Sequence, residues 1–101
     1  MNKQAIESTK LHVFGEVVTL RVDKYQQGET TAILGICETG ETVGVLTVNV
    51  PGTPLAEDEV IIKNWSENER FAEAAFASGL FTDTGRTVRT GYVEAPIWRV
   101  N

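Results

Sequence analysis

Apolar side chains recur along this chain with two different periods, and the two periods mark strands and a helix. Val18, Leu20 and Val22 alternate with polar residues over 17–25, which is the pattern of a strand with one face buried. Residues 31–37 are apolar on both faces, which is typical of a strand in the middle of a sheet. The pattern predicts strands at residues 11–14, 17–25, 31–37, 42–50, 60–63 and 88–100.

Short glycine-containing turns separate the first four of these strands. Gly15 and Glu16 fit a two-residue hairpin turn, and residues 26–29 and 38–41 carry turn chemistry as well. Consecutive strands joined by such turns pair with one another in antiparallel fashion. The first half of the chain is therefore predicted to be an antiparallel meander.

Three features interrupt the strand pattern. The apolar phase changes near Gly44, which predicts a bulge or bend there. Residues 82–85 predict a turn. Pro96 has no N–H to give to a neighbouring strand, so it predicts an edge strand or a break.

Residues 67–78 carry the helical period. Ser66 and Glu69 have the spacing of a capping box, in which both side chains bond free N–H groups at the helix start. Gly79 supplies the left-handed residue that commonly ends a helix. One arc of this helix is apolar and is predicted to be buried, namely Phe71, Ala72, Ala74, Ala75 and Phe76.

These elements predict an α+β fold, with a mostly antiparallel sheet of about five to six strands and one helix packed on one face. The length of 101 residues fits a single domain over 1–101, and residues 1–9 are polar and expected to be flexible. No apolar signal segment or membrane span is present, so the protein is expected in the cytoplasm and not in a membrane.

The negative charge is concentrated in one part of the chain. The net charge is −5, whereas residues 38–73 alone hold eight acids against two bases and carry −6. Direct binding of nucleic acid is therefore not expected, because a phosphate-binding surface is normally basic. The sequence predicts instead that an acidic surface binds a protein partner with a basic surface, or a complex that itself binds nucleic acid. The residues assigned to this surface are Glu57, Asp58, Glu59, Glu67, Glu69 and Glu73.

The residues that could carry catalysis are few. His12 and Cys37 are each the only residue of their type, so neither a disulfide nor a two-histidine metal site can form within the chain. The adjacent acids 57–59 lack the spacing of a calcium loop, and no phosphate-binding glycine motif is present. We therefore expect no metal, no cofactor and no enzymatic activity. A small enzyme that uses Cys37 with His12 is kept as an alternative.

Several short blocks in the second half resemble a known group of proteins. The blocks are Lys63-Asn64-Trp65-Ser66-Glu67-Asn68-Glu69, Ser78-Gly79-Leu80, residues 84–88 and residues 90–96. On the basis of these blocks, residues 48–100 resemble an uncharacterised family of small proteins encoded on phages and conjugative elements of bacteria. The resemblance implies an accessory protein of a mobile genetic element, and it assigns no catalytic residue.

This setting suggests a narrower function. Small acidic proteins of mobile elements sometimes inhibit host defence nucleases, as anti-CRISPR and anti-restriction proteins do, by covering the channel that holds nucleic acid. Clustered negative charge suits such a role, because complementary charge speeds encounter and fixes orientation. A structural subunit, in which an exposed edge at residues 87–93 pairs with another copy, is a third possibility. The sequence leaves the oligomeric state open.

Overall fold

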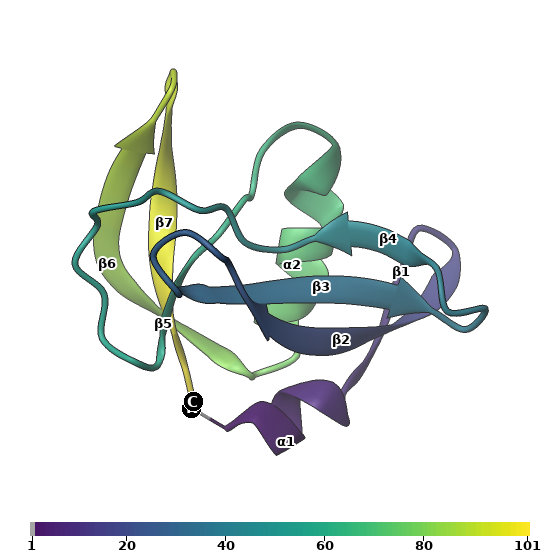
Figure 1. Ribbon diagram of the computed structural model, residues 1–101. Coiled ribbons are helices and arrows are strands. Elements are labelled where there is room, and N and C mark those ends of the chain that lie inside the picture. Colours follow the sequence, from purple (N-terminus) through teal and green to yellow (C-terminus); the bar gives the residue numbers. More distant parts are fainter. Residues whose placement is uncertain (1) are drawn as a thin grey trace.

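A computed structural model describes residues 2–101, and it shows an α+β fold with two antiparallel sheets and one main helix (Figure 1). The first sheet has the strand order β1-β2-β3-β4 and the second has the order β5-β7-β6. The elements in chain order are α1 (Lys3–Glu7), β1 (Lys10–Val13), β2 (Glu16–Lys24), β3 (Thr31–Cys37), β4 (Thr42–Val45), β5 (Glu59–Ile61), the 3-10 turn η1 (Ser66–Asn68), α2 (Glu69–Ala77), β6 (Phe81–Thr90) and β7 (Val93–Val100).

The first sheet is the predicted meander. Each of its strands pairs with the next one along the chain, and all pairs are antiparallel. The first turn is shifted by one residue from its predicted place: Phe14 and Gly15 both have positive φ, as a type I′ hairpin turn requires. The predicted irregularity near Gly44 is confirmed, because β4 has one extra residue, Val43, where its pairing with β3 changes register.

The second sheet differs from the prediction in two ways. Residues 82–85 form no turn and lie within β6, where the register with β7 shifts and Gly85 has a φ of 81°. Pro96 lies in β7, which is the central strand of this sheet rather than an edge strand. Pro96 has no N–H to donate, but this disturbs the pairing of the strands little. On one side, β5 ends at the residue opposite Ile97. On the other side, Pro96 lies opposite Thr87, where the irregular part of β6 ends. The structure thus has seven strands in two sheets, whereas the sequence predicted a single sheet of about five to six strands.

The segment that follows β4 joins the two sheets. Leu46 donates its N–H to the carbonyl of Ile33 in β3 at 2.8 Å, and its own carbonyl accepts the N–H of Lys63 at 2.8 Å. Val48 donates to the carbonyl of Ile61 in β5 at 3.0 Å. Hydrogen bonds therefore continue from the first sheet to the second through residues 46–48, called here the crossing segment.

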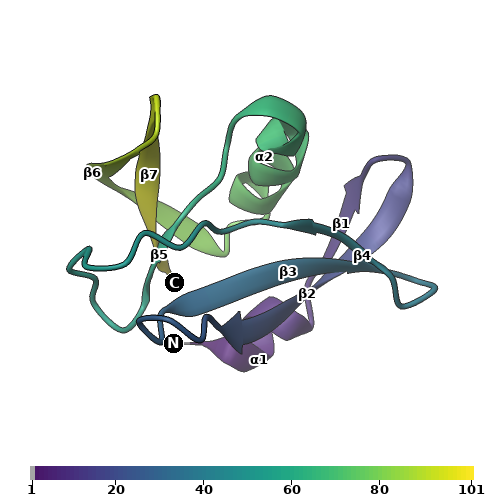
Figure 2. The same ribbon diagram turned by 45° about the horizontal axis from the view of Figure 1, so that its top comes forward.

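Helix α2 contacts both sheets, through β1 of the first and β6 of the second (Figures 1 and 2). The main core draws side chains from both sheets and both helices, among them Ile6, Ile33, Val60, Phe71 and Trp98. The other face of the second sheet holds a smaller cluster of Ile61, Ala95 and Ile97, which is covered by partly buried residues that include Val48, Val50 and Leu55.

The start of the chain is more ordered than its polar sequence predicts. Residues 1–9 were expected to be flexible, yet Lys3–Glu7 form α1, and Asn2 caps this helix by accepting the N–H of Ala5 at 3.2 Å. Ile6 is fully buried in the main core, and this burial accounts for a helix that its local sequence would not form alone. Met1 lies outside the described residues.

Helix α2 begins differently from the prediction and ends as predicted. The capping box does not form: Ser66 lies in η1, and α2 begins at Glu69 without a side-chain cap. Asn68 instead donates its amide to the carbonyls of Val45 and Lys63, at 2.9 and 2.7 Å, which fastens the helix start to β4. Gly79 follows the helix with a φ of 83°, as expected. Neither helix in residues 2–101 has the length and apolar character needed to cross a membrane.

Candidate functional site

Five of the six acids predicted to form one surface line three separate concavities. Glu57 and Glu59 line one beside the β2–β3 turn, Glu67 lines a groove along β4, and Glu69 and Glu73 line a groove between α2 and β7. Asp58 is half-buried and lines none of the three. The structure therefore brings together only two neighbouring pairs from the predicted set.

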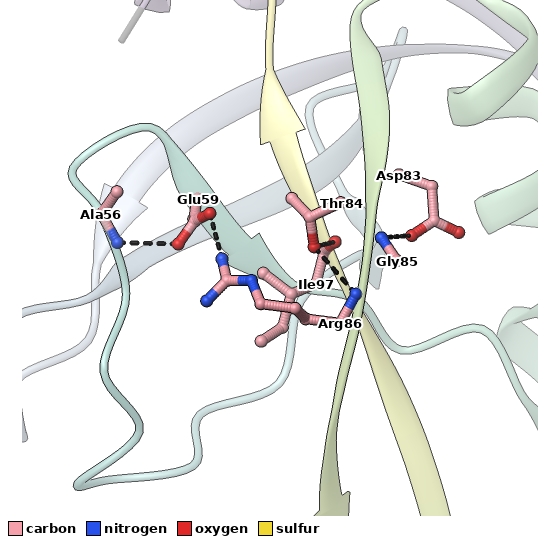
Figure 3. A network of polar contacts seen from close by, with 7 residues as sticks. All are labelled: Ala56, Glu59, Asp83, Thr84, Gly85, Arg86 and Ile97. Atoms are coloured by element: carbon pink, nitrogen blue, oxygen red, sulfur yellow. Dashed lines mark hydrogen bonds and ion pairs between the residues drawn. The ribbon is translucent and has the colours of Figure 1, made fainter.

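Glu59 is occupied by contacts within the protein (Figure 3). Its carboxylate accepts the N–H of Ala56 at 2.8 Å and forms an ion pair with Arg86, and its side chain is only 12% exposed. The Ala56 N–H and the Arg86 guanidinium both favour the charged carboxylate, so they lower the pKa of Glu59. Glu59 thus ties the loop before β5 to β6 and presents little free charge to a partner.

The irregular part of β6 holds Arg86 in place for this ion pair. Asp83 accepts the N–H of Gly85 at 2.9 Å, and the Thr84 hydroxyl donates to the carbonyl of Ile97 at 2.7 Å. The same hydroxyl accepts the N–H of Arg86 at 3.2 Å (Figure 3). The residues whose composition predicts a turn therefore form a bulge that directs Arg86 toward Glu59.

Glu67 is also paired. Lys63, four residues earlier in the segment before η1, donates to its carboxylate at 3.0 Å, and the Glu67 side chain is 72% exposed. The backbone N–H of Glu67 itself and the Lys63 ammonium lower the pKa of Glu67 to about 2. The Lys63 charge offsets that of Glu67 at this place.

Glu69 and Glu73 are the two predicted acids on the outer side of α2. The ion pairs found in residues 2–101 are Lys63–Glu67 and Arg86–Glu59, so neither Glu69 nor Glu73 takes part in one. Both are exposed and four residues apart, where like charges repel. They line a hollow of about 350 Å³, called here the α2–β7 groove, whose lining residues are Asn64, Glu69, Ala72, Glu73, Phe76, Ala77 and Trp98.

Aromatic side chains form one end of the α2–β7 groove. Phe76 was predicted to lie on the buried arc of α2, yet it is 45% exposed. Trp98 of β7 is 6% exposed and already fills the adjoining core space, with its ring centroid 5.0 Å from that of Phe76 and 5.5 Å from that of Phe81. Phe76 is therefore left as an exposed ring resting on a buried one. The helical period could have placed Phe76 beside Glu69 and Glu73, but the contribution of β7 has no signal in the local sequence.

Cys37 and His12 lie on opposite faces of the first sheet. Cys37 is paired in register with Val18, and Val18 with Leu11, so all three side chains point toward the main core. His12 is the neighbour of Leu11 along β1, so its side chain points to the other face and is exposed. This register keeps the thiol and the imidazole apart, and the Cys–His alternative finds no support in the geometry.

The environment of Cys37 is that of a core residue. It is 7% exposed, and its sulfur lies 3.0 Å from the hydroxyl of Thr39. The Thr39 hydroxyl lowers the pKa of the Cys37 thiol, but a reagent can reach so buried a sulfur only with difficulty. Within residues 2–101, no group of three or more His, Cys, Asp or Glu side chains is placed to hold a metal ion.

Other exposed apolar side chains indicate less clearly what kind of ligand would bind. The groove along β4 has a volume of about 800 Å³ and includes Phe14 and Val45, which are 43% and 36% exposed. The charges of Lys63 and Glu67 in its lining are already paired with each other. Tyr92 is fully exposed at the tip of the β6–β7 hairpin. The remaining charged residue of the groove along β4 is Glu16, so this groove has one acid outside the two ion pairs where the α2–β7 groove has two.

Comparisons with protein-family models, with curated proteins and with solved structures give no match. The resemblance of residues 48–100 to proteins of phages and conjugative elements therefore stays a prediction. The geometry and charge of the α2–β7 groove are the observations that bear on function.

Proposed function

We propose that this chain is a non-enzymatic binding protein that captures a basic segment of another protein in the α2–β7 groove. The observation that supports this most directly is the position of Glu69 and Glu73, two unpaired carboxylates beside the exposed ring of Phe76. The proposal keeps the acidic helix face expected from the sequence, and it assigns Glu59 and Glu67 to contacts within the protein.

The two parts of the groove contribute in different ways. Exposed charges such as Glu69 and Glu73 add about 1 kcal/mol or less per ion pair, so they chiefly speed encounter and orient the partner. Aromatic side chains in a partly enclosed site supply more of the affinity, because the partner removes them from water. Phe76 therefore forms the anchor of the proposed interface, the buried Trp98 supports its ring, and the acids determine the charge of what binds.

A narrower form of the proposal is an accessory protein of a mobile genetic element that blocks a host defence nuclease. The basic nucleic-acid channel of such a nuclease has the charge that Glu69 and Glu73 would attract. This form predicts that an anti-CRISPR or anti-restriction target loses DNA or RNA binding when the protein is added. Full nuclease activity at excess protein would exclude it for that nuclease.

Charge reversal on α2 tests the general proposal. Glu69→Lys with Glu73→Lys should abolish capture of the partner from a bacterial lysate, because both groove carboxylates become cations. The matched control is Glu38→Lys with Glu41→Lys, which makes the same change in net charge at exposed positions on the β3–β4 turn. Capture by each variant is measured by quantitative mass spectrometry, with and without nuclease treatment of the lysate.

The control decides between a site and a general effect of charge. The proposal requires that capture is lost in the α2 variant and kept in the turn variant, both after nuclease treatment. Equal loss in both variants would show that net charge alone matters. Loss of capture on nuclease treatment would show a nucleic-acid partner instead.

A further inference from the structure

The lining of the α2–β7 groove follows one stripe of α2. Glu69, Glu73 and Phe76 stand at positions i, i+4 and i+7, so each lies next to the following one on the helix surface. Ala72 and Ala77 occupy the same stripe, and their short side chains leave room between the carboxylates and the aromatic rings. Trp98 forms the opposite wall from β7. The stripe thus offers two anions and an exposed ring within reach of one side chain.

Arginine and lysine would use this arrangement differently. The guanidinium group of arginine is planar, so it can stack on an aromatic ring while its N–H groups point sideways to a carboxylate. The ammonium group of lysine is compact and strongly hydrated, and it gains less from a site that combines a ring with a carboxylate. Glu73 lies one helical turn from Phe76, which is the spacing that a stacked guanidinium needs in order to reach both.

The two carboxylates give a second reason for a cation at this place. Glu69 and Glu73 repel each other across one turn, and none of the ion pairs in the described chain relieves this repulsion. A single guanidinium between them would be attracted to both. Because it has five N–H donors, it can bond to one carboxylate through a fork and still donate to the other.

Trp98 supports the ring of Phe76 from the core side. Trp98 is 6% exposed, and its ring centroid lies 5.0 Å from that of Phe76. Trp98 thus backs the Phe76 ring at the wall of the α2–β7 groove, and Phe76 is the ring that stays open to a bound side chain.

From these observations, and resting on the proposed function, we infer that the α2–β7 groove is a receptor for an arginine side chain in a peptide segment of the partner. The guanidinium stacks on Phe76 and pairs with Glu73 and Glu69. No covalent step is involved.

A titration followed by NMR tests this inference with short peptides of known composition. The probes are acetyl-Ala-Arg-Ala-Arg-Ala-amide and its counterparts in which both arginines are lysine or citrulline. Trp98 and Trp65 are the two tryptophans, and Trp65 packs against the smaller cluster, so its indole signal is an internal reference. The arginine peptide should shift the Trp98 indole signal in a saturable way, and the lysine peptide should bind about tenfold more weakly. The citrulline peptide, which is neutral, should bind more weakly still.

Two substitutions test separately how much the aromatic ring and the negative charge contribute to peptide binding. Phe76→Leu removes the ring at an exposed position and should reduce arginine binding to the level of lysine binding. Glu73→Gln should weaken both peptides, whereas the control Glu41→Gln should weaken neither. Circular dichroism of each variant confirms that it is folded before titration.

The outcomes distinguish this inference from the proposed function. Equal binding of the arginine and lysine peptides would overturn the inference, as would shifts at Trp65 alone or no saturable shift with any peptide. If partner capture still depends on Glu69 and Glu73 in that case, the proposed function stands and the arginine receptor does not. If neither capture nor peptide binding depends on the two acids, both fail.

Discussion

At the scale of single residues, Gly35 of β3 has no side chain at the place where α2 presses against the sheet. A Cβ added there would lie 2.7 Å from Cζ of Phe71 and 3.0 Å from Cγ1 of Val18. Phe71 is fully buried, so its ring cannot move aside into solvent. Gly35→Ala should therefore lower the free energy of unfolding by about 1–3 kcal/mol, as overpacking of a core typically does. Urea denaturation followed by tryptophan fluorescence measures the change.

Gly44 on the neighbouring strand is the matched control for this residue. A Cβ at Gly44 would lie 3.2 Å from Cδ2 of Phe71, which is tight contact without severe overlap. Gly44→Ala should cost less than Gly35→Ala. If the two variants lose the same stability, or if Gly35→Ala loses none, the close packing of Phe71 does not explain the glycine.

At the scale of elements, the side chain of Asn68, rather than the predicted capping box, holds the start of α2 in position. Its side chain is 5% exposed and bonds the carbonyls of Val45 and Lys63, which belong to different parts of the chain. Asn68→Ala should lower the free energy of unfolding by about 1–3 kcal/mol, because it leaves two partly buried carbonyls without this donor. Asn64→Ala, at an exposed position nearby, should change stability by no more than about 0.5 kcal/mol. Thermal and urea unfolding of both variants give the comparison.

The same scale shows which elements the sequence can predict. Residues 17–25, 31–37 and 67–78 carry several repeats of one hydrophobic period, and each contains most of an observed strand or helix. Helix α1 has only five residues and depends on burial of Ile6 against distant strands, so no local pattern reveals it. The second sheet was predicted incompletely because residues 82–85 have the composition of a turn, whereas Thr82 and Asp83 pair with β7 and the next two residues form a bulge within β6.

At the scale of the whole molecule, the candidate site was predicted only in part. Closeness in sequence suggested that Glu57, Asp58 and Glu59 would join Glu67, Glu69 and Glu73 on one surface. In the folded chain β7 lies beside β5, and its Trp98 forms a wall of the groove that Glu69 and Glu73 line. Contact between elements so far apart in sequence depends on the strand order, which local patterns do not contain. The acids of the helix were therefore predictable, and their aromatic neighbour from β7 was not.

The two sheets should unfold as one unit, because they share a core and a hydrogen-bonded crossing segment. Thr47, in that segment, is 3% exposed; its hydroxyl accepts the N–H of Ile33 at 3.2 Å and bonds the Tyr25 hydroxyl at 2.9 Å. Two probes report on the two sheets separately: reactivity of the buried Cys37 thiol in β3, and fluorescence of the tryptophans, of which Trp98 lies in β7.

In urea, the Cys37 and tryptophan transitions should therefore coincide, as expected for two-state unfolding of a small domain. Thr47→Val removes the hydroxyl and leaves the N–H of Ile33 and the Tyr25 hydroxyl without this partner. The variant should shift both transitions to lower urea by the same amount, since the segment belongs to both sheets, with a loss of about 1–3 kcal/mol. The matched control Thr82→Val changes a threonine on β6 outside the crossing segment and should leave both midpoints closer to those of the parent chain. A tryptophan transition that precedes reaction of Cys37, in the parent chain or in Thr47→Val, would show that the second sheet opens alone and that the crossing segment does not couple it to the first.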